Sequence, residues 1–254
     1  MSESVETFYD DLAESYHLMF ENWSHTVDRQ AAILGPILEQ HTGKSSAYVL
    51  DCTCGIGTQT IGLAQRGHTL VGSDLSGSAV AWAMSEARTR DLDISFHVAD
   101  MRDLSKFSET GFDAVLAGDN ALPHLLSQRD LELAAVEIAA KLKDSGVLLA
   151  TIRDYDQLLL TRPTMQAPAF YEQDGKSRFV HQVWQWHEEQ YALHVYITLE
   201  TESGWTVKHF DSRYRALRRS DMNQALQAAG FRDIRWLEPE ATSFYQPIVI
   251  ATRS

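Results

Sequence analysis

Three aspartates are placed where an α/β protein can bind a nucleoside. Asp51, Asp74 and Asp100 each follow an apolar, strand-like run, and Gly55 and Gly57 come soon after the first of them in "DCTCGIGTQT". A ligand of an open α/β sheet binds beyond the carboxyl ends of the strands, where a glycine turn lets it approach the backbone. The next helix offers it free N–H groups. A carboxylate at the position of Asp74 can reach both ribose hydroxyls, so the pattern predicts a nucleoside-binding loop.

The composition of the loop argues against a dinucleotide. A dinucleotide site uses G-x-G-x-x-G, whereas this loop has two glycines, and Thr53 stands where the first glycine is usual. Asp51 would repel a diphosphate but would suit the ammonium group of a methionine-like moiety. S-adenosylmethionine is therefore the better ligand. Asp100, Met101 and Arg102 close the third strand-like run, where the adenine edge is expected.

The loop resembles the first motif of the class I S-adenosylmethionine-dependent methyltransferases, D-x-G-C-G-x-G. Asp51, Cys54, Gly55 and Gly57 match it, and Thr53 departs from it. The family tolerates a small residue there. The resemblance therefore implies cofactor binding with a slightly altered loop geometry.

Further segments resemble the glycine N-methyltransferase and glycine/sarcosine methyltransferase group. "GDNALPHL" (118–125) is similar to its G-N-S-x-x-H-L segment, and "RDYD" (153–156) is similar to its R-N-Y-D. The order Tyr16, Trp23, Arg29 is similar to the residues that cover the cofactor there, and "SRYRALRRSDMNQALQAAGF" resembles its late tyrosine-containing segment. The resemblance implies N-methylation of a small molecule, with S-adenosylhomocysteine as product and no metal.

The loop pattern and the resemblance together predict two sets of site residues. The first set is expected to bind the cofactor: Tyr16, Trp23, Arg29, Asp51, Thr53, Cys54, Gly55, Gly57, Asp74, Leu75, Asp100, Met101, Arg102 and Asp119. The second is expected to bind the acceptor or assist the transfer: Asn120, His124, Arg153, Tyr155 and Tyr214.

Methyl transfer is an in-line displacement that depends mainly on positioning and desolvation. Arg153, a fixed planar fork, could hold a substrate carboxylate or the carbonyl edge of a heterocycle; the alternative is a salt bridge to Asp154 or Asp156. His124 could accept the proton of an attacking nitrogen or could be a packing residue. Asn120 could contact the substrate N–H or the adenosyl group, or simply form a turn.

Alternating strand-like and helix-like runs between residues 47 and 154 must position these side chains. The strand-like runs are "AYVLD" (47–51), "TLVGSD" (69–74), "ISFHVAD" (94–100), "FDAVLAGD" (112–119) and "GVLLATIRD" (146–154). Short connections through helices predict right-handed βαβ units and a parallel sheet covered on both faces. The fold class is thus α/β, with a doubly wound Rossmann-like methyltransferase sheet.

The pattern changes to period two after residue 155. Residues 178–217 alternate apolar and polar types, with breaks at "HEEQ" and "ESG", which predicts an antiparallel meander that forms a lid. A helix capped by Ser220 and ended by Gly230 should follow, and then two closing strands, one of them antiparallel. The expected division is a helical cap, the cofactor-binding core, the lid and the final core elements, over residues 1–46, 47–154, 155–215 and 216–254.

Composition limits the partners. The net charge of −13 argues against nucleic acid, which needs clustered basic residues. No apolar run is long enough to cross a bilayer and the start lacks a signal-peptide pattern, so the protein is expected to be cytoplasmic, without a membrane partner. Cys52 and Cys54, the only cysteines, are expected to be thiols. The oligomeric state is left open between a monomer and a homo-oligomer.

The acceptor is left open among several chemistries. A glycine- or sarcosine-type amine is the nearest family precedent. Trp184, Trp186 and Trp205 fall in the predicted lid, which favours a water-poor chamber for a flat nitrogen heterocycle, such as a toxoflavin-type azapteridine precursor. O-methylation is a third possibility. A non-catalytic sensor of S-adenosylmethionine or S-adenosylhomocysteine is the alternative of a different class.

Overall fold

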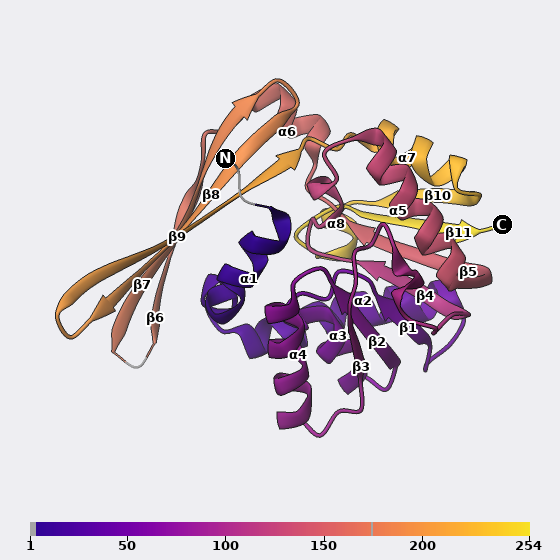
Figure 1. The fold of residues 1–254 in the computed structure, drawn as a ribbon, viewed down its shortest axis with the longest axis horizontal. Helices are drawn as coiled ribbons and strands as arrows, with labels where there is room; N and C mark the ends of the chain where they lie inside the picture. Colours follow the sequence, from indigo (N-terminus) through magenta and orange to yellow (C-terminus); the bar gives the residue numbers. More distant parts are fainter. Residues whose placement is uncertain (1–3, 174) are drawn as a thin grey trace.

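A seven-stranded sheet forms the centre of the chain in the computed structural model, which describes residues 4–173 and 175–254. The strand order is β10-β11-β5-β4-β1-β2-β3, and only β11 runs antiparallel to its neighbours (Figure 1). This confirms the predicted doubly wound α/β fold with one antiparallel strand near the C-terminus. The strands are β1 (Tyr48–Asp51), β2 (Thr69–Asp74), β3 (Ser95–Val98), β4 (Phe112–Ala117), β5 (Leu142–Thr151), β10 (Phe231–Leu237) and β11 (Ile248–Arg253).

Helices cover both faces of this sheet, which explains why its central strands are apolar throughout. On one face, Val49 and Leu116 pack against Leu34 of α2. On the other face, Leu50 packs with Leu131 of α5. The helices of this layer and its surroundings are α2 (Trp23–Thr42), α3 (Thr58–Gln65), α4 (Gly77–Thr89), α5 (Gln128–Lys141), α7 (Arg219–Ala228) and α8 (Pro239–Thr242), with short 3-10 turns η1 (His17–Met19), η2 (Leu104–Lys106) and η3 (Leu122–His124).

Helix α7 begins earlier than its sequence predicts. Its N-cap is Arg218, which makes no side-chain capping bond, and Ser220 lies within the first turn. The predicted Ser220 cap is therefore wrong. The predicted end is confirmed, because the helix stops at Ala228 and Gly230 follows with a φ of 87°, a conformation that glycine adopts without a steric penalty.

The insertion after β5 is a second, four-stranded antiparallel sheet. Its order β6-β7-β8-β9 is that of the predicted meander. The sequence pattern missed its first strand and the short helix before it. These elements are α6 (Tyr155–Thr161), β6 (Met165–Gln173), β7 (Lys176–His187), β8 (Gln190–Thr201) and β9 (Gly204–Arg215).

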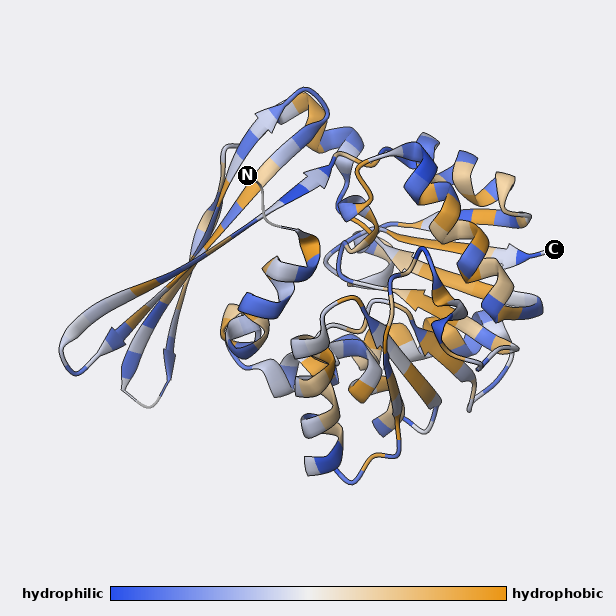
Figure 2. Cartoon of the chain, viewed as in Figure 1, coloured by the Kyte–Doolittle hydropathy of each residue, from blue (hydrophilic) through white to orange (hydrophobic). Residues whose placement is uncertain are grey.

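Helix α1 (Val5–Tyr16) lies between the four-stranded sheet and the core (Figure 1). Phe8 and Leu12 of α1 are buried in the same hydrophobic cluster as Val195 and Ile197 of β8. Figure 2 shows core strands that are largely hydrophobic, whereas the meander strands change colour along their length. One face of the meander therefore packs toward α1 and the other faces away.

Two further expectations concern cysteines and membranes. Cys52 and Cys54 are buried free thiols, as predicted. None of the helices in the described parts of the chain combines the length and hydrophobicity that crossing a bilayer requires.

Candidate functional site

The carboxyl ends of β1, β2 and β4, with the segment after β3, surround a pocket of about 440 Å³. The arrangement follows from the parallel sheet, whose strands all end at one edge. Most of the residues predicted to contact the cofactor line this pocket: Tyr16, Thr53, Cys54, Gly55, Asp74, Leu75, Asp100, Met101, Arg102 and Asp119.

The glycine-containing loop is tied to both neighbouring strand ends. Gly55 has a φ of 50° and donates its N–H to Asp74 Oδ2 at 2.8 Å. Thr53 connects the loop to the end of β4 through its side chain: Thr53 Oγ1 accepts a hydrogen bond from the N–H of Gly118 at 3.1 Å. A glycine could not make that last bond. Where a glycine would give the loop a wider range of backbone conformations, Thr53 instead gives it a hydrogen bond to the residue after β4.

Asp51 and Gly57 lie beneath the loop and not in the pocket. Asp51 is fully buried, and its carboxylate accepts from Thr60 Oγ1 at 2.6 Å and from the N–H of Thr53 at 3.3 Å. Burial raises its pKa to about 7. Gly57 begins α3, and a Cβ there would lie 2.9 Å from Ile61. Both residues therefore shape the loop from behind.

Trp23 and Arg29 also lie outside this pocket. Trp23 is buried and donates its indole N–H to Thr58 Oγ1 at the start of α3. Arg29 is exposed on α2 and lines a neighbouring cavity. The aromatic residue of the N-terminal segment that does reach the pocket, besides Tyr16, is Tyr9.

The carboxylates of the pocket differ in their partners. Asp100 forms an ion pair with Arg102. Asp74 and Asp119 are partly buried, burial raises the pKa of each, and neither forms an ion pair within residues 4–173 and 175–254. Asp119 accepts a hydrogen bond from Tyr245. The pocket thus holds acidic groups that lack cationic partners in the described chain.

A second cavity of about 920 Å³ adjoins the first and shares Tyr9, Tyr16 and Asp119 with it. The meander supplies one wall through Gln182, Trp184, Leu193 and Tyr214. Further wall residues come from α1, α2, α6 and the segment before β11. This cavity is therefore bounded by parts of the chain that are far apart in sequence.

Arg153, which follows β5, projects its guanidinium into this second cavity among hydroxyl, amide and aromatic groups. Its Nη1 donates to Tyr191 Oη at 2.8 Å, its Nη2 donates to Gln182 Oε1 at 3.3 Å, and its Cζ lies 4.7 Å from the centre of the Trp184 ring. Burial disfavours the charge of Arg153, but the phenol groups of Tyr191, Tyr155 and Tyr214 outweigh this effect and raise its pKa.

The alternative salt bridge of Arg153 to Asp154 or Asp156 is not formed. Both carboxylates instead approach Arg219, at 3.5 Å and 3.9 Å. Arg153 has no carboxylate partner within the described part of the chain. Its guanidinium is therefore available to a ligand.

Asn120 links the end of β4 to Arg153. Its Oδ1 accepts from the backbone N–H of Arg153 at 3.0 Å, and its side chain is 3 % exposed. Its Nδ2 is buried and has no hydrogen-bond partner among the described residues. Because Asn120 lines the second cavity, this amide could donate to a bound molecule.

His124 is enclosed and poorly suited to accept a proton. Its Nε2 lies 2.9 Å from Tyr9 Oη, and its Nδ1 lies 3.2 Å from the backbone carbonyl oxygen of Arg213. An N–H at Nδ1 can donate to that carbonyl, which leaves Nε2 to accept from Tyr9. Burial lowers the pKa of His124 to about 3, so the imidazole is a weak base at neutral pH.

The two predicted tyrosines have different positions. Tyr214 lines the second cavity, and its ring lies 5.8 Å from Arg153 Cζ; burial raises its pKa to about 12. Tyr155 is 1 % exposed and lies behind the cavity wall, where its hydroxyl lies 3.0 Å from that of Tyr191. Tyr155 thus supports the residue that orients Arg153.

The tryptophans of the meander do not form one chamber. Trp184 is 5 % exposed and lines the cavity. Trp186 donates its indole N–H to the backbone carbonyl of Pro163, and Trp205 is 51 % exposed. Only Trp184 of the three is a cavity residue.

Sequence reasoning missed Tyr9, Gln182 and Tyr191. Gln182 and Tyr191 are on strands that pair with each other, at inward positions of the alternation. The period-two pattern contained this signal, because their side chains share the face of Leu193. Arg153 was itself predicted as a site residue, but its contact with this face of the meander could not be predicted before the meander had been placed.

Comparison with known proteins is consistent with this geometry. The family model described as "Methyltransferase domain" matches residues 49–146. A glycine/sarcosine N-methyltransferase of Parasynechococcus marenigrum is 30% identical over 154 residues, which are 61% of this chain and 53% of the relative. The chain spans about half the length of the curated relatives it matches.

Solved structures share the whole fold. DesVI of Streptomyces venezuelae superposes with a TM-score of 0.79 at 20% identity and covers 96% of this chain and 99% of its own. The sugar N-methyltransferase KedS8 of Streptoalloteichus has a TM-score of 0.74 at 18% identity, with 100% and 94% covered. Residues 49–146 of the chain thus match a methyltransferase domain, and the whole chain shares the fold of these solved structures.

The first pocket suits S-adenosylmethionine, the cofactor of methyltransferases with this fold. S-adenosylmethionine carries a sulfonium and an ammonium group, and the carboxylates of Asp74 and Asp119 lack cationic partners in the described chain. Opposite charges in a partly buried site attract more strongly than in water. A side chain at Gly55 would point into open space, so the loop leaves room for a ligand against its backbone.

Proposed function

We propose that this methyltransferase transfers the methyl group of S-adenosylmethionine to an amine nitrogen of a small acceptor that Arg153 binds through a carboxylate or another acceptor group. One observation carries the proposal. The guanidinium of Arg153 is partly buried beside the cofactor pocket and has no carboxylate partner within the described residues. A partly buried charge is costly unless it is paired, so an anionic acceptor would supply what Arg153 lacks.

The surrounding residues would fix the acceptor's position. Tyr191 and Gln182 hold the guanidinium plane, and the unpaired Nδ2 of Asn120 offers one more donor. S-adenosylmethionine, when bound, supplies an already activated methyl group. The residues of the chain then need only to bind, orient and desolvate the two reactants.

Apart from the carboxylate of Asp119, which we assign to the cationic groups of the cofactor, no good proton acceptor faces the shared boundary of the two cavities among the described residues. The pKa of His124 is about 3, and burial raises the pKa of Tyr9 and Tyr16 well above the ordinary value. A phenol with a raised pKa stays protonated and does not accept the proton of an amine. We therefore infer that the acceptor nitrogen enters in its neutral form.

The size of the second cavity favours an acceptor larger than glycine as a second candidate. Glycine would fill roughly 150 Å³ if each of its non-hydrogen atoms takes about the 30 Å³ of a water molecule, whereas the cavity measures about 920 Å³. The relatives named glycine/sarcosine N-methyltransferase support the small amine. The structural neighbour named a sugar N-methyltransferase, and the cavity, support an amino sugar or a nitrogen heterocycle.

The deciding experiment is a methylation panel with the purified full chain. S-adenosylmethionine would be combined with glycine, sarcosine, an amino-sugar nucleotide and a carboxylated nitrogen heterocycle, and the products would be analysed by mass spectrometry. N-methylglycine would support the small amine, and methylation of only the larger compounds would support the second candidate. Products methylated on oxygen, or cofactor binding without transfer to any amine, would overturn the proposal, and the latter would favour a sensor.

A further inference from the structure

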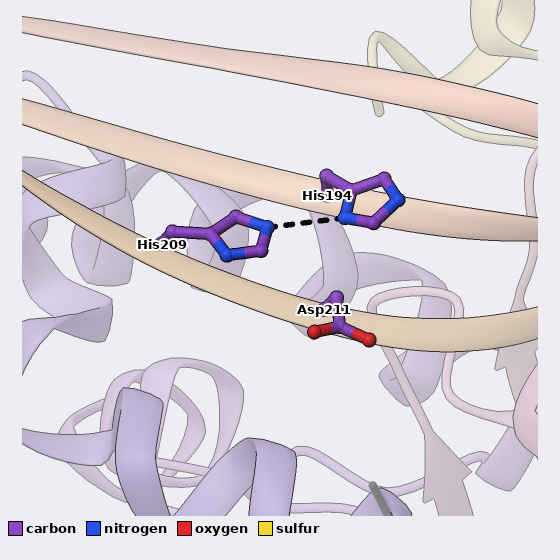
Figure 3. A group of neighbouring side chains, drawn as sticks. All are labelled: His194, His209 and Asp211. Carbon is purple, nitrogen blue, oxygen red and sulfur yellow. Dashed lines mark hydrogen bonds between the residues drawn. The ribbon is translucent and has the colours of Figure 1, made fainter. Parts of the chain in front are cut away.

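Two histidines and an aspartate meet on the face of the meander that points away from α1. The register pairs His194 of β8 with Asp211 of β9, and His209 lies two residues before Asp211 on the same face. Figure 3 shows the His194 and His209 rings turned toward each other, with the Asp211 carboxylate beside them. From these three residues we propose a binding site for one divalent transition-metal ion of the Zn²⁺ type.

The distances suit a shared ion. His194 Nδ1 and His209 Nε2 lie 3.0 Å apart. Two nitrogens that bind one Zn²⁺ at about 2.0–2.1 Å in tetrahedral geometry lie roughly 3.3 Å apart. One ligand atom from each of the three residues, the Asp211 carboxylate included, lies within 4.8 Å of the other two. The Asp211 carboxylate would have to turn toward the two nitrogens to complete three protein ligands.

The two histidines are hydrogen-bonded to each other through His194 Nδ1 and His209 Nε2, so an ion would displace the proton between these atoms. None of the three side chains has another hydrogen-bond or ion-pair partner in the described chain. Asp211 makes no side-chain hydrogen bond or ion pair there, and the Nε2 atom of His194 is buried without a partner. The rings are nearly parallel, with an angle of 19° between their planes. On the same face, Tyr196 stacks on His209 at 4.7 Å and limits the movement of that ring. The ligands are thus partly ordered before an ion arrives.

The ligand types indicate which ion would bind. Two imidazoles and one carboxylate are typical of Zn²⁺ and related transition metals, whereas Mg²⁺ prefers oxygen ligands. Three protein ligands leave a fourth position for water. The metal site does not depend on the proposed methyl transfer, because its three residues lie on the opposite side of the meander from the second cavity.

An ion at this position would link β8 to β9. The opposite faces of these strands carry Tyr191, which orients Arg153, and Tyr214, which lines the acceptor cavity. The site would therefore brace the rear of the cavity wall. An ion that binds only the folded chain raises its thermal stability.

The test uses the full chain, expressed without a histidine tag and freed of metal with a chelator. Zn²⁺ binding is measured by calorimetry and by competition with a chromogenic chelator, and Co²⁺ serves as a spectroscopic probe of tetrahedral coordination. One ion per chain should bind, with a rise in the melting temperature, and Mg²⁺ should not compete. His209→Ala and Asp211→Asn should each weaken Zn²⁺ binding at least tenfold.

His187→Ala is the matched control, because His187 is exposed on β7 in the same sheet but outside the group. The Zn²⁺ affinity of this variant should equal that of the unmodified chain. His209 is exposed, so its replacement should leave the metal-free melting temperature unchanged. The absence of saturable Zn²⁺ binding would overturn the proposal, and so would equal losses in the His209 and His187 variants.

Discussion

The first pocket, which we assign to the cofactor (the cofactor pocket), and the second cavity, which we assign to the acceptor (the acceptor cavity), are formed in different ways. They share Tyr9, Tyr16 and Asp119. The pocket is formed mainly by the ends of neighbouring parallel strands, whose order places their terminal residues together. The cavity is formed where α1 and a separate antiparallel sheet meet the core. The cofactor side is therefore a property of the sheet, and the acceptor side is a property of packing between layers.

This contrast separates general chemistry from specificity. A family of methyltransferases can keep the strand ends and vary the inserted sheet. In this chain the strand ends, together with Tyr9 and Tyr16 of α1, line the pocket assigned to the cofactor, and the meander does not. In this chain the inserted sheet supplies the side chains around Arg153, including Gln182, Trp184 and Tyr191. Changes on each side should therefore affect one reactant and spare the other.

The largest effect is expected for Arg153→Met. The variant loses a charged donor to the acceptor, which should lower kcat/KM for the accepted substrate roughly 100-fold, about 3 kcal/mol. The affinity for S-adenosylmethionine should be nearly unchanged. Steady-state kinetics and calorimetry would measure both, with the exposed Arg232→Met as control. If the affinity for S-adenosylmethionine fell as much as kcat/KM, the proposed division between a cofactor pocket and an acceptor cavity would be wrong.

Asp74→Asn tests the other side of the comparison. The neutral amide removes a partly buried carboxylate from the cofactor pocket, so S-adenosylmethionine should bind about 1–3 kcal/mol more weakly. The exposed Asp93→Asn should leave the affinity unchanged. Calorimetric titration gives the result directly, and unchanged affinity in the Asp74 variant would contradict a direct cofactor contact.

His124 connects the two regions, and its replacement should change the pH dependence of stability. Its pKa is about 3 in the folded chain and near 6.5 when unfolded. Between about pH 6.5 and about pH 3 the unfolded chain binds a proton at His124 that the folded chain excludes. The free energy of unfolding therefore decreases as the pH falls through this window, and above it His124 causes no such loss.

His124→Gln should remove up to about 1.4 kcal/mol of this dependence for each pH unit. Urea unfolding from pH 7 to pH 4 would measure the slope against that of His187→Gln, a change at an exposed position of β7. Parallel slopes in the two variants would mean that His124 has the same pKa in the folded and unfolded chains.

The smallest effect is expected for Trp184→Leu. The Trp184 ring lies 4.7 Å from Arg153 Cζ, and a cation–π contact contributes about 0.5–2 kcal/mol. The KM for the acceptor should rise by a few-fold to about 30-fold. Trp205→Leu should change nothing measurable, since Trp205 is 51 % exposed. Similar effects of both changes would support the prediction that the meander tryptophans form one substrate chamber.

Much of the core was predictable because its signals are local. The predicted run 69–74 coincides with β2, and the run 112–119 contains β4, since strands buried on both faces are short apolar segments with clear ends. Thr53, Gly55 and Asp74 were likewise identified from strand ends. By contrast, β6 has a mainly exposed pattern with Pro168 inside it, so no alternation revealed it.

Site residues were harder to predict where burial decides the chemistry. Asp51 is an acid by sequence, but its burial beneath the loop was not visible in the motif. His124 has the ordinary imidazole pKa until burial in the folded chain lowers it. His194 and His209 show no ligand spacing along the chain, and only the pairing of β8 with β9 brings them within 3.0 Å.

The order of residues was thus enough to place most of the predicted cofactor residues around one pocket, because a parallel sheet brings consecutive strand ends to one edge. It was also enough to recognise an inserted meander, because alternation with period two has a local cause. Which side chains surround Arg153, which acids reach the pocket and which histidines meet were decided only by tertiary packing. The reason is physical: desolvation and unpaired charge depend on neighbours that the chain brings together from a distance.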